Sequence, residues 1–236
     1  MALERNVYSA RWFEFFHASI DKERTSRETV FIASCAPLPD FRKVLDVCCG
    51  LGRHARALSG LGYSVTGIDR DADIIARARE LGGGPEYVVA DVRNYAPDPG
   101  KFDAATVMGQ SFGYFDAVTN RDVLVRLANG VRKGGRVILD LWNPEFFAAQ
   151  QNEAEFSTPS GTVRENKTVN EDRLFVDLEY PGGNREQFEW QLFTPAQMTD
   201  LARSVGLAAV VSCTNFDVNI PPASSKPRLQ FVLEKQ

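Results

Sequence analysis

Hydrophobic and polar positions follow two different rhythms along the chain. Between Val44 and Trp142, short apolar runs alternate with stretches whose apolar residues recur every three or four positions. Short apolar runs are typical of buried strands, and the longer spacing is typical of amphipathic helices. Strands that alternate with helices imply right-handed crossovers and a mostly parallel sheet. The pattern predicts strands at 44–47, 64–68, 87–90, 104–108 and 136–142, and helices at 53–61, 71–81 and 121–131.

The rhythm changes in the second half of the chain. Apolar and polar residues alternate over 174–180 and again over 188–192, on either side of a Gly-Gly-Asn turn. A period of two is the signal of a half-buried strand. We therefore expect an antiparallel hairpin, joined by a strand near 162–169. The remaining elements are a helix from Thr194-Pro195 to Ser204, with proline at its favoured first position, and strands at 207–213 and 228–233.

The chain begins with a stretch that reads as helix. Tyr8, Trp12, Phe15 and Phe16 recur at the three- and four-residue spacing of one helix face, within a helical region over 7–35. Two prolines then end this region. The helix is either a lid over a ligand site or an ordinary packed amphipathic helix.

Length, charge and cysteine content narrow the class of protein. The 236 residues suit one domain, or one domain with an insertion. A net charge of −4 gives no basic excess, so nucleic acid is not an expected partner. Neither a secretory leader nor an apolar run of about 18 residues is found, and the four cysteines lack metal-ligand spacing. We expect a cytoplasmic protein with reduced thiols, no metal and no membrane partner.

A glycine turn supplies the sharpest local signal. The segment VLDVCCGLGRHA at 44–55 reads as a strand, a turn containing Gly50 and Gly52, and the start of a helix. Such a turn lets the backbone approach a nucleotide-like ligand at the carboxyl edge of a sheet. Asp69 follows about 20 residues later, where an acid binds a ribose hydroxyl in dinucleotide-binding proteins. On this loop alone, NAD-like dinucleotides and S-adenosylmethionine both remain open.

Two further acids favour the second cofactor. Asp46 lies inside the apolar strand before the loop, where it would disfavour a pyrophosphate but tolerate an ammonium and a sulfonium. Asp91 follows the third strand, where it would accept a hydrogen bond from an adenine amino group. The alternatives are that Asp46 ties down loop N–H groups and that Asp91 caps a helix.

An ordered set of motifs resembles the class I S-adenosylmethionine-dependent methyltransferases, in a bacterial branch that acts on small molecules. The set comprises VLDVCCGLGRHA, GIDRD at 67–71, ADVRNY at 90–95, FDAATVMGQSFGYF at 102–115 and VRKGGRVILDLWN at 131–143. The resemblance implies that Gly50 and Gly52 pass under the methionine part of the cofactor. It places Asp69 at the ribose, Asp91 and Val92 at the adenine, and Arg70 beside the adenine. The cofactor-binding set is completed by Asp46, Cys48, Met108 and Gln110, with Cys48 standing where the family has glycine.

The resemblance also implies an architecture. We expect an α/β fold with a Rossmann-like doubly wound sheet, mostly parallel with its last strand antiparallel. An N-terminal helical lid would occupy 1–40, the methyltransferase core 41–150 plus 195–236, and an antiparallel β insertion over the substrate 151–194. The alternative for the insertion is a hairpin whose aromatic face completes the core.

Methyl transfer from a sulfonium needs mainly positioning and exclusion of water. The methyl group would point to the ends of the fourth and fifth strands, where the catalytic candidates are Tyr114, Asp140 and Asn143. Each also has a structural alternative: packing for Tyr114, a buried structural acid for Asp140 and a turn for Asn143. The substrate-binding candidates are Tyr8, Trp12, Trp142, Arg164, Tyr180 and Trp190.

The expected reaction is methylation of a soluble small-molecule acceptor, with S-adenosylhomocysteine as product. We favour N-methylation because no histidine is expected in the pocket to act as a base. C- and O-methylation of a biosynthetic intermediate stay open, as do an NAD(P)-dependent oxidoreductase and a cofactor-binding module without catalysis. A homodimer is compatible with the sequence.

Overall fold

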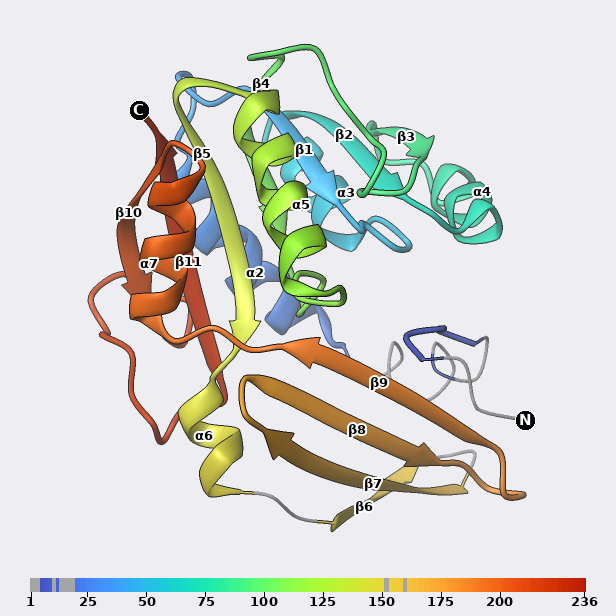
Figure 1. Cartoon of the computed structure of the whole chain (residues 1–236). Helices are drawn as coiled ribbons and strands as arrows, with labels where there is room; N and C mark the ends of the chain where they lie inside the picture. Colours follow the sequence, from blue (N-terminus) through green and yellow to red (C-terminus); the bar gives the residue numbers. More distant parts are fainter. Residues whose placement is uncertain (1–4, 10–11, 13–19, 151–152, 159–160) are drawn as a thin grey trace.

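The strands of the structure form two separate sheets (Figure 1). The computed structural model describes residues 5–9, 12, 20–150, 153–158 and 161–236. Among these, seven strands form the main sheet and four form a smaller antiparallel sheet beyond the carboxyl end of β5. No described helix has both the length and the apolar character needed to cross a membrane.

The main sheet has the order β10-β11-β5-β4-β1-β2-β3. Its neighbours pair in parallel from β3 across to β5, whereas β11 runs antiparallel to both β5 and β10. This confirms the predicted doubly wound sheet with one strand reversed. The strands are β1 (Lys43–Val47), β2 (Ser64–Asp69), β3 (Glu86–Val89), β4 (Phe102–Val107), β5 (Val131–Trp142), β10 (Leu207–Cys213) and β11 (Arg228–Lys235).

The smaller sheet has the order β6-β7-β8-β9 with every pair antiparallel. Its inward face carries the apolar residues of the alternating pattern, including Leu174, Val176 and Phe188. β6 was not expected, because its sequence EAEFST alternates weakly and most of its side chains are exposed. The strands are β6 (Glu153–Thr158), β7 (Gly161–Asn170), β8 (Arg173–Glu179) and β9 (Arg185–Gln191).

Helices cover both faces of the main sheet. Residues of α5 and α7 pack on one face, and residues of α2, α3 and α4 pack on the other. The short helix α6 is not predicted by the sequence pattern, because its Asn-Pro start indicates only a turn. The helices are α2 (Lys22–Cys35), α3 (Arg53–Gly60), α4 (Ala72–Glu80), α5 (Ala117–Gly130), α6 (Pro144–Ala149) and α7 (Pro195–Ser204).

The N-terminal region is not one helix from residue 7. α2 begins at Lys22, where the Asp21 side chain accepts a hydrogen bond from Arg24 N (2.6 Å) and caps the helix. Residues 7–9 are not helical, so the prediction of a helix there is wrong. Phe15 and Phe16 lie outside the described residues.

Candidate active site

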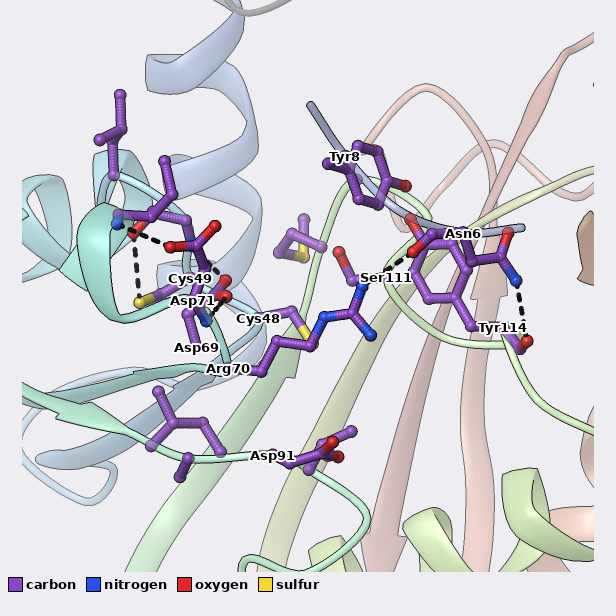
Figure 2. A pocket seen from close by; sticks show the side chains of 18 of the residues that line it. Asn6, Tyr8, Cys48, Cys49, Asp69, Arg70, Asp71, Asp91, Ser111 and Tyr114 are labelled. Carbon is purple, nitrogen blue, oxygen red and sulfur yellow. Dashed lines mark hydrogen bonds between the residues drawn. The ribbon is translucent and has the colours of Figure 1, made fainter. Parts of the chain in front are cut away.

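A cavity of about 520 Å³ lies where the parallel strands end. Its walls come from the loops that follow β1, β2, β3 and β4, from the start of α3 and from the N-terminal segment. Figure 2 shows Asp69 and Asp71 on one side, and Tyr8, Ser111 and Tyr114 on the other. In open parallel sheets this edge is the usual position for a ligand.

The glycine loop bends through left-handed backbone. Cys48, Gly50 and Gly52 have φ of +54°, +54° and +74°. Glycine is needed most at Gly52, because a Cβ there would lie 2.1 Å from the Tyr87 hydroxyl. Cys48 accepts the strained angle as a non-glycine residue and lines the cavity. Burial raises the pKa of its thiol, so the sulfur is protonated at neutral pH and is no nucleophile.

Two carboxylates border the cavity at the ends of β2 and β3. Asp69 accepts hydrogen bonds from the N–H groups of Gly50 (3.0 Å) and Asp71 (3.1 Å), which fix its side chain beside the loop. Asp91 forms an ion pair with Arg93 at 2.6 Å. The Arg93 side chain, by hydrogen bonding, holds the pKa of Asp91 below its ordinary value. Each carboxylate keeps lone pairs for a ligand hydroxyl or amine.

A buried ion cluster supports the first turn of α3. Glu28 on α2 is 0 % exposed, and its carboxylate lies 2.5 Å from Arg53 and 2.7 Å from His54 Nε2. A third bond comes from Arg24 Nε at 2.9 Å. Burial would raise the pKa of Glu28, but the His54 hydrogen bond and the Arg53 charge outweigh it and hold the pKa below the ordinary value.

His54 and Arg53 are cavity residues that the sequence reasoning missed. The expectation that no histidine lies in the pocket is wrong, because His54 lines it on the glycine-loop side. Its Nε2 is engaged by Glu28, so that nitrogen is held by a carboxylate instead of facing the opposite wall. Only their position in the sequence could have indicated this, because both residues directly follow the glycine turn.

The opposite end of the cavity is aromatic. The loop after β4 supplies Ser111, Tyr114 and Phe115, and the N-terminal segment supplies Tyr8 and Trp12. Burial raises the pKa of Tyr114 far above its ordinary value, so its phenol is neutral at physiological pH. This end therefore offers rings and hydroxyl groups, and Met108 also lines the cavity.

Asn6 connects the N-terminal segment to three other parts of the molecule. Its side-chain amide donates to the carbonyls of Tyr114 and Glu189 (both 3.1 Å), and its side-chain oxygen accepts from Glu189 N (2.8 Å). The Asn6 carbonyl accepts from Arg70 at 2.8 Å, across the cavity (Figure 2). The segment is thereby fixed to β9 and to the loops after β2 and β4.

Four of the predicted residues near the strand ends do not line the cavity. Asp46 is 2 % exposed, and its carboxylate accepts a hydrogen bond from the Thr106 hydroxyl at 3.2 Å. Burial raises the pKa of Asp46. Gln110 turns inward and donates to the Phe112 carbonyl at 3.2 Å. Asp140 accepts from Arg228 (2.5 Å) and from Gly109 N (3.1 Å), so it positions a cavity loop without facing the cavity.

Asn143 is the fourth. It caps α6 through Glu145 N at 3.1 Å, and its amide donates to two carbonyls of the loop before β11, each at 2.9 Å. These bonds agree with the alternative that Asn143 serves the local chain turn and not catalysis. Gly52, the N-cap of α3, is also not among the lining residues.

The four substrate candidates after residue 140 also lie away from the cavity. Trp142 stacks on Phe147, with ring centroids 4.8 Å apart. Tyr180 is 2 % exposed and donates its hydroxyl to Glu186 at 2.9 Å. Arg164 pairs with Glu155 in a separate polar hollow of about 480 Å³ on the smaller sheet. Trp190 reaches the site indirectly, because its ring packs 5.4 Å from that of Tyr114.

Comparison with known proteins identifies a methyltransferase domain within the chain. A family model described as a methyltransferase domain matches residues 44–135, the span that contains the glycine loop and both carboxylates. A Streptomyces fradiae protein named dTDP-3-amino-3,6-dideoxy-alpha-D-glucopyranose N,N-dimethyltransferase is 28 % identical over 72 % of this chain and 71 % of its own length. A ubiquinone biosynthesis O-methyltransferase of Thiobacillus denitrificans is 35 % identical over 46 % of this chain and 47 % of its own length.

Solved structures share the whole fold at low sequence identity. An S-adenosylmethionine-dependent methyltransferase of Clostridium acetobutylicum aligns with a TM-score of 0.79 at 16 % identity, covering 95 % of this chain and 96 % of the other. CalS10, an amino pentose methyltransferase of Micromonospora echinaspora solved with S-adenosylmethionine, aligns with a TM-score of 0.73 at 16 % identity, covering 99 % and 100 %. Residues 44–135 therefore match a methyltransferase domain, and the chain shares the fold of solved S-adenosylmethionine-dependent methyltransferases.

Proposed function

We propose that this protein transfers the methyl group of S-adenosylmethionine to an amine of a soluble small molecule. The observation that carries this proposal is the contrast between the two ends of the cavity. One end has the glycine loop with Asp69 and Asp91, and the other has aromatic rings with neutral hydroxyl groups. A nucleoside fits the first end, and an amine that attacks as its free base fits the second.

In this proposal the cofactor lies along the loops after β1, β2 and β3. Asp69 accepts hydrogen bonds from the ribose hydroxyls, and Asp91 with Val92 borders the adenine. Gly50 passes under the methionine part, where Cys48 also lines the cavity. The sulfonium methyl then points toward the loop after β4. The smaller sheet supports this acceptor end, because Trp190 packs on Tyr114 and Phe188 lies 4.8 Å from Tyr8.

The chemistry of the acceptor end favours nitrogen over oxygen. A neutral amine attacks the methyl carbon with its own lone pair, so the protein needs chiefly to align the groups and exclude water. An alcohol or phenol needs a base within hydrogen-bond reach. Among the described lining residues at this end, Tyr8, Ser111 and Tyr114 carry hydroxyl groups, and the raised pKa of Tyr114 keeps its phenol protonated, so it does not act as a base.

The named relatives support the same choice without deciding it. The Streptomyces fradiae protein and CalS10 are named for amino sugars, whereas the Thiobacillus denitrificans protein is named for O-methylation. The test must therefore offer both kinds of acceptor atom.

Paired acceptors that differ only in the attacking atom test the proposal. Amino sugars, free and as nucleoside diphosphate derivatives, are incubated with S-adenosylmethionine alongside the corresponding hydroxyl sugars and a catechol. S-adenosylhomocysteine is measured by mass spectrometry, and the methyl position by NMR. We expect methylation of the amine members alone. A methyl group found on oxygen, or turnover confined to the catechol, would overturn N-methylation while leaving the cofactor assignment in place.

A further inference from the structure

Three aromatic rings meet at right angles at the acceptor end of the cavity. The ring of Tyr8 stands at 81° to that of Trp12, with centroids 4.6 Å apart, and at 86° to that of Tyr114, with centroids 5.9 Å apart. All three residues line the cavity. These edge-to-face contacts gather the three rings into one aromatic corner of the cavity. A cation within about 6 Å of a ring centroid is attracted by the ring face.

The corner is held from behind by the smaller sheet. Phe188 lies 4.8 Å from Tyr8, Trp190 lies 5.4 Å from Tyr114, and these two supporting rings stack on each other at 5.7 Å. Asn6 fixes the backbone on both sides, through the Tyr114 carbonyl and Glu189. A corner supported in this way is ordered before a ligand arrives, which lowers the entropic cost of binding.

Charged residues of both signs line the cavity. Asp69, Asp71 and Asp91 line it together with the guanidinium groups of Arg53 and Arg70. Arg70 reaches toward the aromatic corner, but it donates to the Asn6 carbonyl at 2.8 Å. Within the part of the chain that the structure describes, no cationic side chain lies over the ring of Tyr8 or Tyr114. The described chain therefore supplies no cation of its own to these two rings.

We propose that Tyr8, Trp12 and Tyr114 form a box for a methylated ammonium group of the acceptor. The acceptor is then an amine that carries more than one methyl group in the final product, and the enzyme methylates it in succession. This inference rests on the proposed function. Aromatic boxes recognise methylated ammonium groups because the ring quadrupole attracts a charge that is poorly hydrated.

Each transfer balances in the same way. The nitrogen lone pair forms a bond to the methyl carbon, the carbon–sulfur bond breaks, and its electron pair stays on sulfur to give S-adenosylhomocysteine. One N–H proton goes to solvent when the product is released as a neutral amine. Before the second transfer the methylated ammonium gives one N–H proton to solvent, which restores the nitrogen lone pair, and this lone pair then attacks a second S-adenosylmethionine. The box holds the partly methylated ammonium while the cofactor is exchanged.

Choline and its neutral carbon analogue 3,3-dimethyl-1-butanol test the box directly. Each is titrated calorimetrically into protein saturated with S-adenosylhomocysteine, which has no sulfonium. Wild type and Tyr114→Phe, which keeps the ring, should bind choline about tenfold more tightly than the alcohol. Tyr114→Leu, which removes the ring, should lose most of that preference. If Tyr114→Leu does not fold, Trp12→Phe and Trp12→Leu provide the same comparison. A monomethylated amine acceptor should also show a lower KM than its unmethylated parent.

Two results would overturn the box for a methylated ammonium, and a third would overturn the proposed function. Equal affinity for choline and the alcohol would show that the corner does not recognise charge. A box that holds the cofactor's sulfonium instead would make S-adenosylmethionine bind more tightly than S-adenosylhomocysteine, by a factor that Tyr114→Leu removes, while choline fails to bind. A protein that does not bind S-adenosylhomocysteine at all would overturn the proposed function on which the inference rests.

Discussion

Glu28 anchors the helix that follows the glycine loop, and its removal should weaken the whole fold. The carboxylate belongs to α2, outside the matched methyltransferase domain, yet it bonds Arg53 and His54 at the start of α3. Its side chain is 0 % exposed, so solvent does not screen these interactions. We choose Glu28→Gln, which keeps the side-chain volume and removes only the charge.

The cost follows from the burial of the partners that stay behind. Removing one partner of a buried ion pair costs about 3–5 kcal/mol. Arg53 and Arg24 are 16 % and 36 % exposed and can recover some hydration, so we expect about 3 kcal/mol, at the lower end. For a chain of this size the melting temperature should fall by about 6–12 °C, at roughly 2–4 °C per kcal/mol. Glu155→Gln breaks an exposed pair with Arg164 and should cost at most about 1 kcal/mol.

Urea denaturation monitored by tryptophan fluorescence gives the two free energies of unfolding. The folded pKa of Glu28 is lowered, so its charge stabilises the protein above the ordinary value of 4.5 and ceases to do so as the pH falls toward the lowered value. The difference between wild type and Glu28→Gln should therefore shrink below pH 4.5. Equal losses in Glu28→Gln and Glu155→Gln, or a difference that grows in acid, would refute this reasoning.

Three other predictions follow from single contacts. Asn6→Gly keeps the backbone angle but removes the side-chain bonds to two segments, each contributing about 1 kcal/mol, so the acceptor KM should rise about tenfold; equal loss of S-adenosylhomocysteine affinity would contradict this. Gly52→Ala should unfold at lower urea than Gly82→Ala, because only the first Cβ meets another atom, at 2.1 Å; equal midpoints would contradict this. Arg228→Met leaves buried Asp140 unpaired and should lower the free energy of unfolding by about 3 kcal/mol; a change below about 1 kcal/mol would contradict this.

The local pattern of apolar and polar residues was sufficient to predict the main sheet and the cofactor end of the cavity. The parallel strands are marked by apolar runs, and Asp69 ends β2 while Asp91 lies two residues after β3, so the positions of both acids depend on chain order alone. The alternation over 174–180 likewise places Leu174 and Val176 on one buried face. Such features need no knowledge of distant contacts.

The acceptor end depends on contacts between distant residues, which a single sequence does not show. Asp140 is an acid at the end of a predicted strand, which made it a catalytic candidate. Its hydrogen bond with Arg228, 88 residues away, shows that its role is structural. Trp190 and Tyr180 alternate toward the interior of the smaller sheet, away from the cavity. Asn6 gave no signal, because its partners Tyr114 and Glu189 are more than 100 residues distant.

Calorimetric titration of S-adenosylhomocysteine tests the cofactor assignment most directly. Wild type, Asp69→Ala and the exposed control Asp73→Ala are compared, with NADH as the competing ligand and melting temperature as the check on folding. We predict binding near one to one in wild type and Asp73→Ala. Asp69→Ala should bind at least about tenfold more weakly, since one hydrogen bond to a charged group contributes roughly 1.5–3 kcal/mol. NADH binding without S-adenosylhomocysteine binding, or undiminished affinity in Asp69→Ala, would contradict the account.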